Sequence, residues 1–470
     1  MSDRKGNIMP PEVDVVVIGA GVAGLVAARD LVAAGHTVAV LEARDRVGGR
    51  LLNAELPGGA PIELGGQWVG PGQTHVLSLI SDLGLSLFPT YDSGGHIVEL
   101  DGRLVKYSGR IPRVSPVLLA DLGYGLWQLD RGGHSLPSPD RPLSGKAAEL
   151  DAQTFESWIT KNLRTERGKR YMRYITEAVF AAEPEELSTL WVSAFLAASG
   201  GADKLISTKG GAQQDRIVGG SQQIALKLAE RLGDSVRLGS AVRGIDWDED
   251  GVRVELADGS TVTGERAILA MPPVLCGKLR YTPELPGDRV QLTERMPMGR
   301  AIKINVVYDK PFWRGEGLSG QANSTSRAVG TVFDNTPQGG NPGVLVGFVE
   351  GRHADQAALL SPDERRRRNL DDLAAYFGPA ASEPIEYLET DWTAEEFTGG
   401  CYGAFTGPST LTQFGTALRK PIGPLHWAGS ETARQSVGYM DGAVESGHRA
   451  AGEVAALLGK NVRETSEKSV

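Results

Sequence analysis

The chain has 470 residues and a mass of 50.0 kDa, more than one compact core usually carries, so two or more domains are expected. Hydrophobic residues make up 41% of the chain and charged residues 23%, a globular composition that argues against a disordered, fibrous or membrane-embedded protein. The 58 acidic residues outnumber the 49 basic ones, so neither nucleic acid nor an anionic lipid surface is expected as a partner.

The cysteines and the chain ends indicate the cellular setting. Cys276 and Cys401 are too few and too far apart for a disulfide framework or a structural zinc site, so we expect a reducing compartment and no metal. No segment has the apolar core of a signal peptide, and none approaches ~20 uninterrupted apolar residues. We therefore expect a cytoplasmic protein without a membrane anchor, with flexible ends at 1–12 and 459–470.

The first predicted elements form a βαβ unit. Residues 13–18 are a mostly β-branched run, typical of a strand that is covered on both faces. Apolar residues then recur at helical spacing as far as Gly35, and a second strand over 37–41 ends at Glu42.

A glycine motif, GxGxxG, joins the first strand to the helix and consists of Gly19, Gly21 and Gly24. After a buried strand and before a helix, this motif predicts dinucleotide binding, because the glycines permit a tight turn and close approach of a pyrophosphate. The N–H groups and the dipole at the helix N-terminus favour the anion, and Glu42 can accept hydrogen bonds from a ribose diol.

The remaining elements divide the chain into two regions. Short strands with Asp-Gly turns between 236 and 269 predict a β-meander. The segments around it mix helical runs with strands such as 301–308. We predict a discontinuous first domain and a second domain inserted between its pieces. The first domain comprises 13–80, 211–280 and 386–458, and the second comprises 81–210 and 281–385.

Four further segments carry a family resemblance. ARDRVGGR and ELGGQWVG follow Glu42, and near the end of the chain come DWTAEEFTGGCYGAF at 391–405 and WAGSETARQSVGYMDGAVESGHRAA at 427–451. With the glycine motif, these segments resemble the flavin-containing amine oxidases, the monoamine oxidase family, from Val13 to about Leu458. The resemblance implies an α/β fold: a Rossmann-like FAD-binding domain with a β-meander, and an inserted α+β substrate domain, in the two-domain architecture shared with p-hydroxybenzoate hydroxylase.

The resemblance implies FAD as the cofactor and supplies its contacts. Trp392 resembles the tryptophan beside the isoalloxazine, and Glu431 a residue near the ribityl and phosphate groups. Cys401 resembles the cysteine that holds the flavin as an 8α-thioether in covalent members, so we predict covalent FAD; the alternative is a small buried residue beside non-covalent flavin. The other implied FAD contacts are Arg44, Gly48, Gly49, Arg50, Gly65, Gly66, Gln67, Trp68, Val242, Gly429 and Met440.

Three residues are predicted to act in catalysis. Tyr402 and Tyr439 resemble the two tyrosines of the family's aromatic cage, which guides an amine toward the flavin. Lys303 lies on a strand of β-branched residues, where an unpaired charge would be costly. The matching lysine of the family holds a water that bridges to flavin N5.

Fewer motifs support the prediction of the substrate pocket than support that of the FAD site. Ile206 matches a gating side chain and Gln213 a glutamine beside the substrate, while Thr331 falls where eukaryotic relatives carry a bulky residue. Ala178 and Val179 are also small, so a wider or differently shaped pocket is a hypothesis.

The predicted reaction is oxidation of a neutral amine by hydride transfer from its α-carbon to flavin N5. The imine hydrolyses to an aldehyde or ketone, and O2 is reduced to H2O2. No second glycine motif is present to hold NADPH, so the electrons are expected from the substrate. The alternatives are an L-amino acid or polyamine oxidase, a flavin desaturase and, last, a non-catalytic flavoprotein. Glu177 is the acidic residue considered for a polyamine. Family members are often dimers, so a homodimer is a further expectation.

Overall fold

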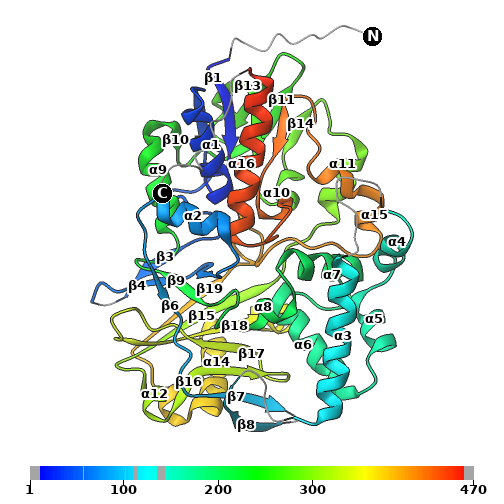
Figure 1. Cartoon of the computed structure of the whole chain (residues 1–470). Helices are drawn as coiled ribbons and strands as arrows, with labels where there is room; N and C mark the ends of the chain where they lie inside the picture. The colour runs from blue at the N-terminus through cyan, green and yellow to red at the C-terminus, as the bar shows by residue number, and fades with distance from the viewer. Residues whose placement is uncertain (1–10, 57, 101, 110–113, 135–142, 460–470) are drawn as a thin grey trace, which may run out of the picture.

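The computed structural model describes residues 11–56, 58–100, 102–109, 114–134 and 143–459 (Figure 1). Its first elements are the predicted βαβ unit: β1 (Val13–Ile18), α1 (Val22–Ala33) and β2 (Val38–Leu41), with the two strands parallel. The strands form where β-branched residues can be buried on both faces, and α1 ends just before Gly35, whose φ of +88° suits glycine.

β1 and β2 belong to an eight-stranded sheet in the upper half of Figure 1. The order is β10–β2–β1–β13–β12–β11–β14, and β20 also pairs with β13. The strands β11, β12 and β13 are antiparallel neighbours, which confirms the predicted meander. The bounds of the added strands are β10 (Val236–Arg237), β11 (Val242–Trp247), β12 (Val252–Leu256), β13 (Thr261–Leu269), β14 (Arg280–Thr282) and β20 (Leu425–Trp427).

The last helix, α16 (Met440–Leu457), packs against α1 beside this sheet (Figure 1). The two helices approach so closely that a side chain at Gly447 would lie 2.5 Å from the carbonyl oxygen of Ala23. Small residues therefore set the distance between the helices, and the N-terminus of α16 is directed toward the centre of the molecule.

A seven-stranded sheet forms part of the lower half, in the order β19–β15–β18–β17–β16–β7–β8 (Figure 1). In the antiparallel pair β15–β18, Ala301 faces Glu350 and Lys303 faces Phe348. Because side chains alternate along a strand, these four residues lie on one face of the sheet. The strands are β7 (Gly95–Leu100), β8 (Arg103–Tyr107), β15 (Ala301–Tyr308), β16 (Leu318–Ser324), β17 (Val329–Asp334), β18 (Gly343–Glu350) and β19 (Glu386–Asp391).

Helices stand beside this sheet and complete the lower half (Figure 1). An apolar core that includes Phe155, Trp158 and Trp191 holds several of them together. The helices of this group are α3 (Pro116–His134), α4 (Lys146–Asp151), α5 (Phe155–Asn162), α6 (Glu166–Phe180), α7 (Thr189–Ala198) and α8 (Ala202–Ile206). The α/β fold with a second α+β region is thereby confirmed.

The other elements are short or peripheral. The short strands are β3 (Asn53–Glu55), β4 (Pro61–Glu63), β5 (Trp68–Val69), β6 (Leu87–Pro89) and β9 (Asp215–Ile217). The other helices are α2 (Thr74–Asp82), α9 (Gln223–Leu232), α10 (Pro273–Cys276), α11 (Gly287–Glu294), α12 (Phe312–Gly315), α13 (Gly351–Ala358), α14 (Pro362–Phe377) and α15 (Thr410–Phe414). Across the described part of the chain, no helix combines the length and the apolar character needed to span a bilayer.

Candidate active site

A continuous cavity of about 510 Å³ is lined by residues from both large sheets. At one end it is bounded by the glycine loop after β1 and by Glu42 at the end of β2. At the other end it is bounded by the seven-stranded sheet and by α6 and α7. The cavity therefore joins the predicted nucleotide site to the predicted substrate pocket.

The glycine loop is shaped to receive a dinucleotide. A side chain at Gly24 would lie 2.0 Å from the carbonyl oxygen of Gly19, so this position requires glycine for packing alone. At Gly21, by contrast, a side chain would point into open space of the cavity. Glu42 is buried, and its carboxylate accepts hydrogen bonds from the backbone N–H groups of Ala20 (2.8 Å) and Arg44 (3.0 Å). The open space at Gly21 and the fixed carboxylate fit a pyrophosphate and a ribose.

An ion pair between the partly exposed Arg50 and the buried Glu431 holds the loop after β2 against the C-terminal motif. Arg50 donates two hydrogen bonds to the carboxylate of Glu431, at 2.6 and 3.0 Å, and one to the carbonyl oxygen of Tyr402. Burial alone would raise the pKa of Glu431, but the guanidinium of Arg50 lowers it below its ordinary value. The pair fixes two sequence motifs that are more than 300 residues apart.

Cys401 and Trp392 line the middle of the cavity. Cys401 is 7% exposed, and burial raises the pKa of its thiol to about 12, an effect that Arg50 opposes. Trp392 donates its indole N–H to the carbonyl oxygen of Leu64, at 3.0 Å. The peptide bond between Cys401 and Tyr402 is cis.

Lys303 lies on β15, where every residue is buried, and its side chain enters the same cavity. Its ammonium donates to the carbonyl oxygen of Gly65 (2.8 Å) and to the side-chain oxygen of Gln67. Burial lowers the pKa of Lys303 from 10.5 to about 7, although the carboxylate of Glu63 opposes this. A cation that loses its proton near neutral pH can change charge during turnover.

The two predicted cage tyrosines line one part of the cavity. The Tyr439 ring packs on Phe195, with centroids 6.0 Å apart, and the Tyr402 ring meets Phe348 edge-on at 6.1 Å. Tyr402 donates its hydroxyl hydrogen bond to Oε1 of Glu350, at 2.6 Å. Burial, and then the charge of Glu350, raise the pKa of Tyr402 well above its ordinary value. Burial also raises the pKa of Tyr439, so both rings are neutral phenols at any physiological pH.

Neutral polar groups around Tyr174 line the far end of the cavity, and Glu350 lines the cavity next to Tyr174. Tyr174 donates to Oδ1 of Asn323 (2.7 Å) and lies 3.0 Å from the hydroxyl of Thr331. Tyr107 and Tyr171 line the same region. Among the described residues that line the substrate half, none is an arginine.

Glu350 is a functional candidate that sequence reasoning missed. It ends β18 on the face that carries Lys303, lines the cavity and is only 4% exposed. Burial raises the pKa of Glu350 well above its ordinary value; the hydrogen bond from Tyr402 opposes this shift, and the nearby charge of Glu177 adds to it. The alternation of side chains along GVLVGFVE predicts that Glu350 and Phe348 lie on the same face of β18. The register with β15, which puts both residues on the same face as Lys303, cannot be read from this segment alone.

The sequence matches the family described as flavin-containing amine oxidoreductase over residues 22–455. The chain belongs to this family. A Mycobacterium tuberculosis protein named as a flavin-containing monoamine oxidase, AofH, is 41% identical over 449 residues, covering 96% of this chain and 98% of the relative. An L-amino acid dehydrogenase of Synechocystis is 35% identical, covering 97% and 99%. The structure of putrescine oxidase bound to putrescine superposes with a TM-score of 0.91 at 34% identity, covering 94% and 99%.

The predicted resemblance, fold and enzyme class of this amine oxidoreductase are thus confirmed, and the family implies a flavin. Most of the predicted site residues line the central cavity: Gly19, Gly21, Val179, Gln213, Val242, Lys303, Thr331, Gly429, Tyr439, Met440 and the residues of 42–50, 65–68 and 392–402 named above. Gly24 and Glu431 lie behind this wall, in packing and ion-pair roles. The side chain of Ile206 lies outside the described residues, so its predicted gating position stays a prediction.

Proposed function

We propose that this amine oxidoreductase oxidises a monoamine with an uncharged tail, with O2 as the final electron acceptor and H2O2 as a product. The observation that supports this most directly is the continuity of the cavity from the glycine loop to Lys303 and the two cage tyrosines. FAD, when bound, supplies the acceptor for the hydride that leaves the α-carbon of the amine.

The residues that would hold FAD line the first half of the cavity. Gly19 and Gly21 would admit the pyrophosphate, Glu42 would accept hydrogen bonds from the ribose, and the N-terminus of α16 would face the flavin. In the second half, Tyr402 and Tyr439 would hold the amine, and Lys303 would place a positive charge near the site of oxygen reduction.

The neutral polar groups at the far end of the cavity support a monoamine. A diamine would need a carboxylate for its second ammonium group, but Glu350 accepts the hydrogen bond of the cage residue Tyr402, and Glu177 is absent from the described residues of the cavity wall and pairs instead with His353. An amino acid would need a cation for its carboxylate, most effectively an arginine. The arginines of the described wall, Arg44 and Arg50, belong to the nucleotide half and are already paired. The hydroxyl and amide groups near Thr331 suit a tail with a polar, neutral group.

The test is anaerobic titration of the purified holoprotein with alkylamines, arylalkylamines, di- and polyamines and amino acids, followed in the visible flavin spectrum. Loss of the flavin band with monoamines, and return of the band with formation of H2O2 when air is admitted, is the expected result. A flavin band that no amine reduces would refute amine oxidation. Reduction by amino acids or diamines alone would refute the monoamine assignment, and slow return of the band in air would refute O2 as the acceptor.

We also propose a thioether between Cys401 and the flavin. The position of the thiol in the cavity wall, beside Lys303 and Arg50, supports this link. The matched variants are Cys401→Ala and Cys276→Ala; Cys276 is also buried, but it is absent from the described lining of the cavity and hydrogen-bonds to the carbonyl oxygen of Met271. After acid denaturation, yellow colour and the added mass of FAD should stay with wild type and Cys276→Ala and be lost from Cys401→Ala. Free flavin from the wild type would refute the link.

A further inference from the structure

A second, small hollow lies behind the wall of the active-site cavity. Its volume of about 10 Å³ leaves room for about one water molecule. Tyr174 and Glu350 line both the cavity and this hollow, so their side chains form the partition between the two. On its other side the hollow is bounded by Glu177 and His353.

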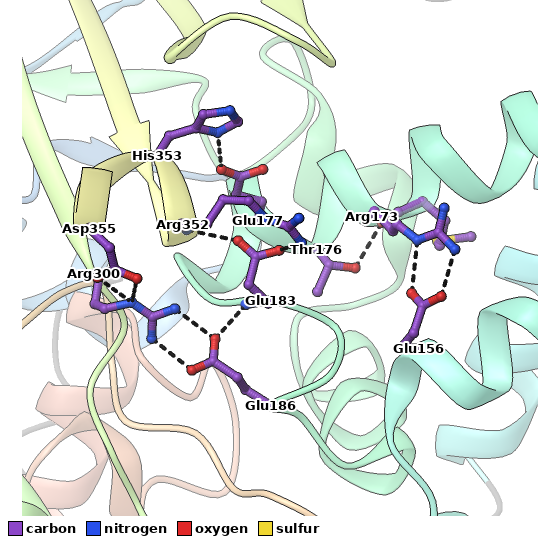
Figure 2. A network of polar contacts seen from close by, with 11 residues as sticks. Glu156, Arg173, Thr176, Glu177, Glu183, Glu186, Arg300, Arg352, His353 and Asp355 are labelled. Carbon is purple, nitrogen blue, oxygen red and sulfur yellow. Dashed lines mark hydrogen bonds and ion pairs between the residues drawn. The ribbon is translucent and has the colours of Figure 1, made fainter. Parts of the chain in front are cut away.

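Glu177 and His353 form a pair that reaches the surface. Nδ1 of His353 lies 2.6 Å from Oε1 of Glu177, and Figure 2 shows the ring and the carboxylate facing each other. The His353 side chain is 25% exposed and that of Glu177 is 16% exposed. The pair therefore has access both to the hollow and to solvent.

The backbone brings this pair close to Glu350. The next residue, Gly351, has a φ of +54°, and a side chain there would lie 3.1 Å from Cγ of Glu177. Glycine at this position thus lets α6 and the start of α13 approach each other directly behind Glu350. The carboxyl groups of Glu350 and Glu177 and the imidazole of His353 therefore line one hollow, which has room for about one water molecule.

The chemistry of the proposed substrate requires a route for a proton. Alkylamines have pKa values near that of lysine, about 10.4, so they arrive at neutral pH as ammonium ions. Hydride loss from the α-carbon needs the neutral amine, and an unpaired ammonium is costly in a cavity walled by aromatic rings. Glu350 is the carboxylate of the described substrate half, and it touches the hydroxyl of a cage tyrosine.

We propose that Glu350 removes the proton from the substrate's ammonium group and that the hollow delivers this proton to the Glu177–His353 pair and then to solvent. An N–H bond of the ammonium breaks and an O–H bond forms on Glu350, with no change in electron count. Transfer through the hollow then restores the Glu350 carboxylate, and the net reaction is loss of one proton from the ammonium to solvent. The inference rests on the proposed amine oxidation.

The other charges around Glu350 leave this route open. Arg327 lines the hollow, but its guanidinium is engaged by Glu99 at 2.9 Å and Asp372 at 3.1 Å. Arg352, beside His353, pairs with Glu183, as Figure 2 shows. From β15, Lys303 faces the carbonyl oxygen of Gly65 and the Gln67 side chain. The hydrogen bond to Glu177 raises the pKa of His353, whereas burial lowers it, and the net shift is upward.

The central test is Glu350→Gln, which keeps the size of the side chain and an acceptor for Tyr402. Anaerobic stopped-flow reduction of the flavin, measured from about pH 6 to 10, should be slower than wild type by at least about tenfold at neutral pH, and the difference should narrow at high pH as more amine arrives neutral. A second readout is proton release to an indicator dye on mixing with tert-butylamine, which has no α-hydrogen and cannot be oxidised. Release should be at least about tenfold slower in Glu350→Gln.

Further variants locate the route. Glu177→Gln and His353→Ala should also slow proton release. The control is Glu156→Gln: Glu156 pairs with Arg173 and does not line the hollow, so this variant should release the proton at the wild-type rate. A pH profile of Glu350→Gln that equals the wild type would overturn the proposal. A weaker amine affinity at every pH with an unchanged limiting rate would also overturn it, because Glu350 would then only bind the ammonium.

Two remaining outcomes separate the claims. If Glu177→Gln and His353→Ala both release the proton at the wild-type rate, the route through the hollow is wrong. If no amine reduces the wild-type flavin, the proposed function fails and this proposal falls with it, whereas reduction by amines together with an unaffected Glu350→Gln overturns this proposal alone.

Discussion

Replacement of Lys303 by methionine should change how the stability of the protein depends on pH. Lys303 is 4% exposed, and burial lowers its pKa from 10.5 to about 7. At about 1.4 kcal/mol per pKa unit, this difference corresponds to about 5 kcal/mol by which the folded state disfavours the charged lysine. The hydrogen bonds to Gly65 and Gln67 are already included in that balance.

The direction follows from proton linkage. Between pH 7 and 10.5 the unfolded chain binds a proton on Lys303 that the folded chain does not, so the wild type gains stability as pH rises. At pH 7 and below the full penalty applies, and above pH 10.5 none remains. From pH 7 to pH 9 this one group should therefore add about 2–3 kcal/mol to the wild type. Lys303→Met lacks the group and should show no such gain.

The assay is urea unfolding of both holoproteins at pH 7 and pH 9, with the free energies of unfolding compared as a double difference. Other titrating groups contribute equally to both proteins and cancel. A difference between wild type and Lys303→Met that is the same at both pH values would refute the reasoning, because Lys303 would then keep its ordinary pKa. The same variant should also lower the rate at which O2 reoxidises the reduced flavin, while the flavin remains bound.

Three further predictions address the cofactor site and the pocket. Gly24→Ala should lower the free energy of unfolding by about 3 kcal/mol or more, because the added methyl group would lie 2.0 Å from the backbone. Gly21→Ala should lose bound FAD but have the same thermal midpoint as the FAD-free wild type, because its methyl group enters open space. Thermal midpoints and flavin content measure the two effects. Glu431→Gln should lower the free energy of unfolding by about 3–5 kcal/mol at neutral pH. Because the pKa of Glu431 is lowered in the folded state, its stabilising effect disappears as the carboxylate is protonated, so the difference from wild type should shrink below about pH 4. The same loss of stability at every pH would contradict this. Thr331→Phe should lower kcat/KM for arylalkylamines by about tenfold but spare small alkylamines; equal loss for both would contradict a wide pocket.

Local patterns account for the parts of the fold that the sequence predicts well. Strands over 13–18 and 301–308 have the predicted bounds because runs of β-branched residues are buried on both faces. The glycine motif is predictable because its chemistry lies within one turn. At the end of α16, however, Leu457 extends the apolar pattern but is 60% exposed, since the last turn lies at the edge of the domain.

Features that depend on pairing between distant segments could not be predicted. Glu350 reaches the cavity through its register with Ala301, and the buried ion pair of Glu63 with Arg216 joins strands that are far apart in the chain. Glu350 stands in none of the motifs quoted above, and a one-residue change of register would turn it to the opposite face. The family resemblance supplied Lys303 and the tyrosines, whereas the carboxylate beside them required the structure.

The chain passes repeatedly between the two large sheets, and this has a mechanical consequence. It crosses directly from β14 to β15 and from β19 to β20, and twice more by way of the three-stranded sheet β5–β9–β6. A hinge that opened the halves would have to bend all of these connections at once and break the hydrogen bonds from Arg216 to the carbonyl oxygens of Asn335 and Thr336, which follow β17. We therefore expect the two halves to keep their relative positions, and ligands to reach the cavity through the movement of single side chains and short loops.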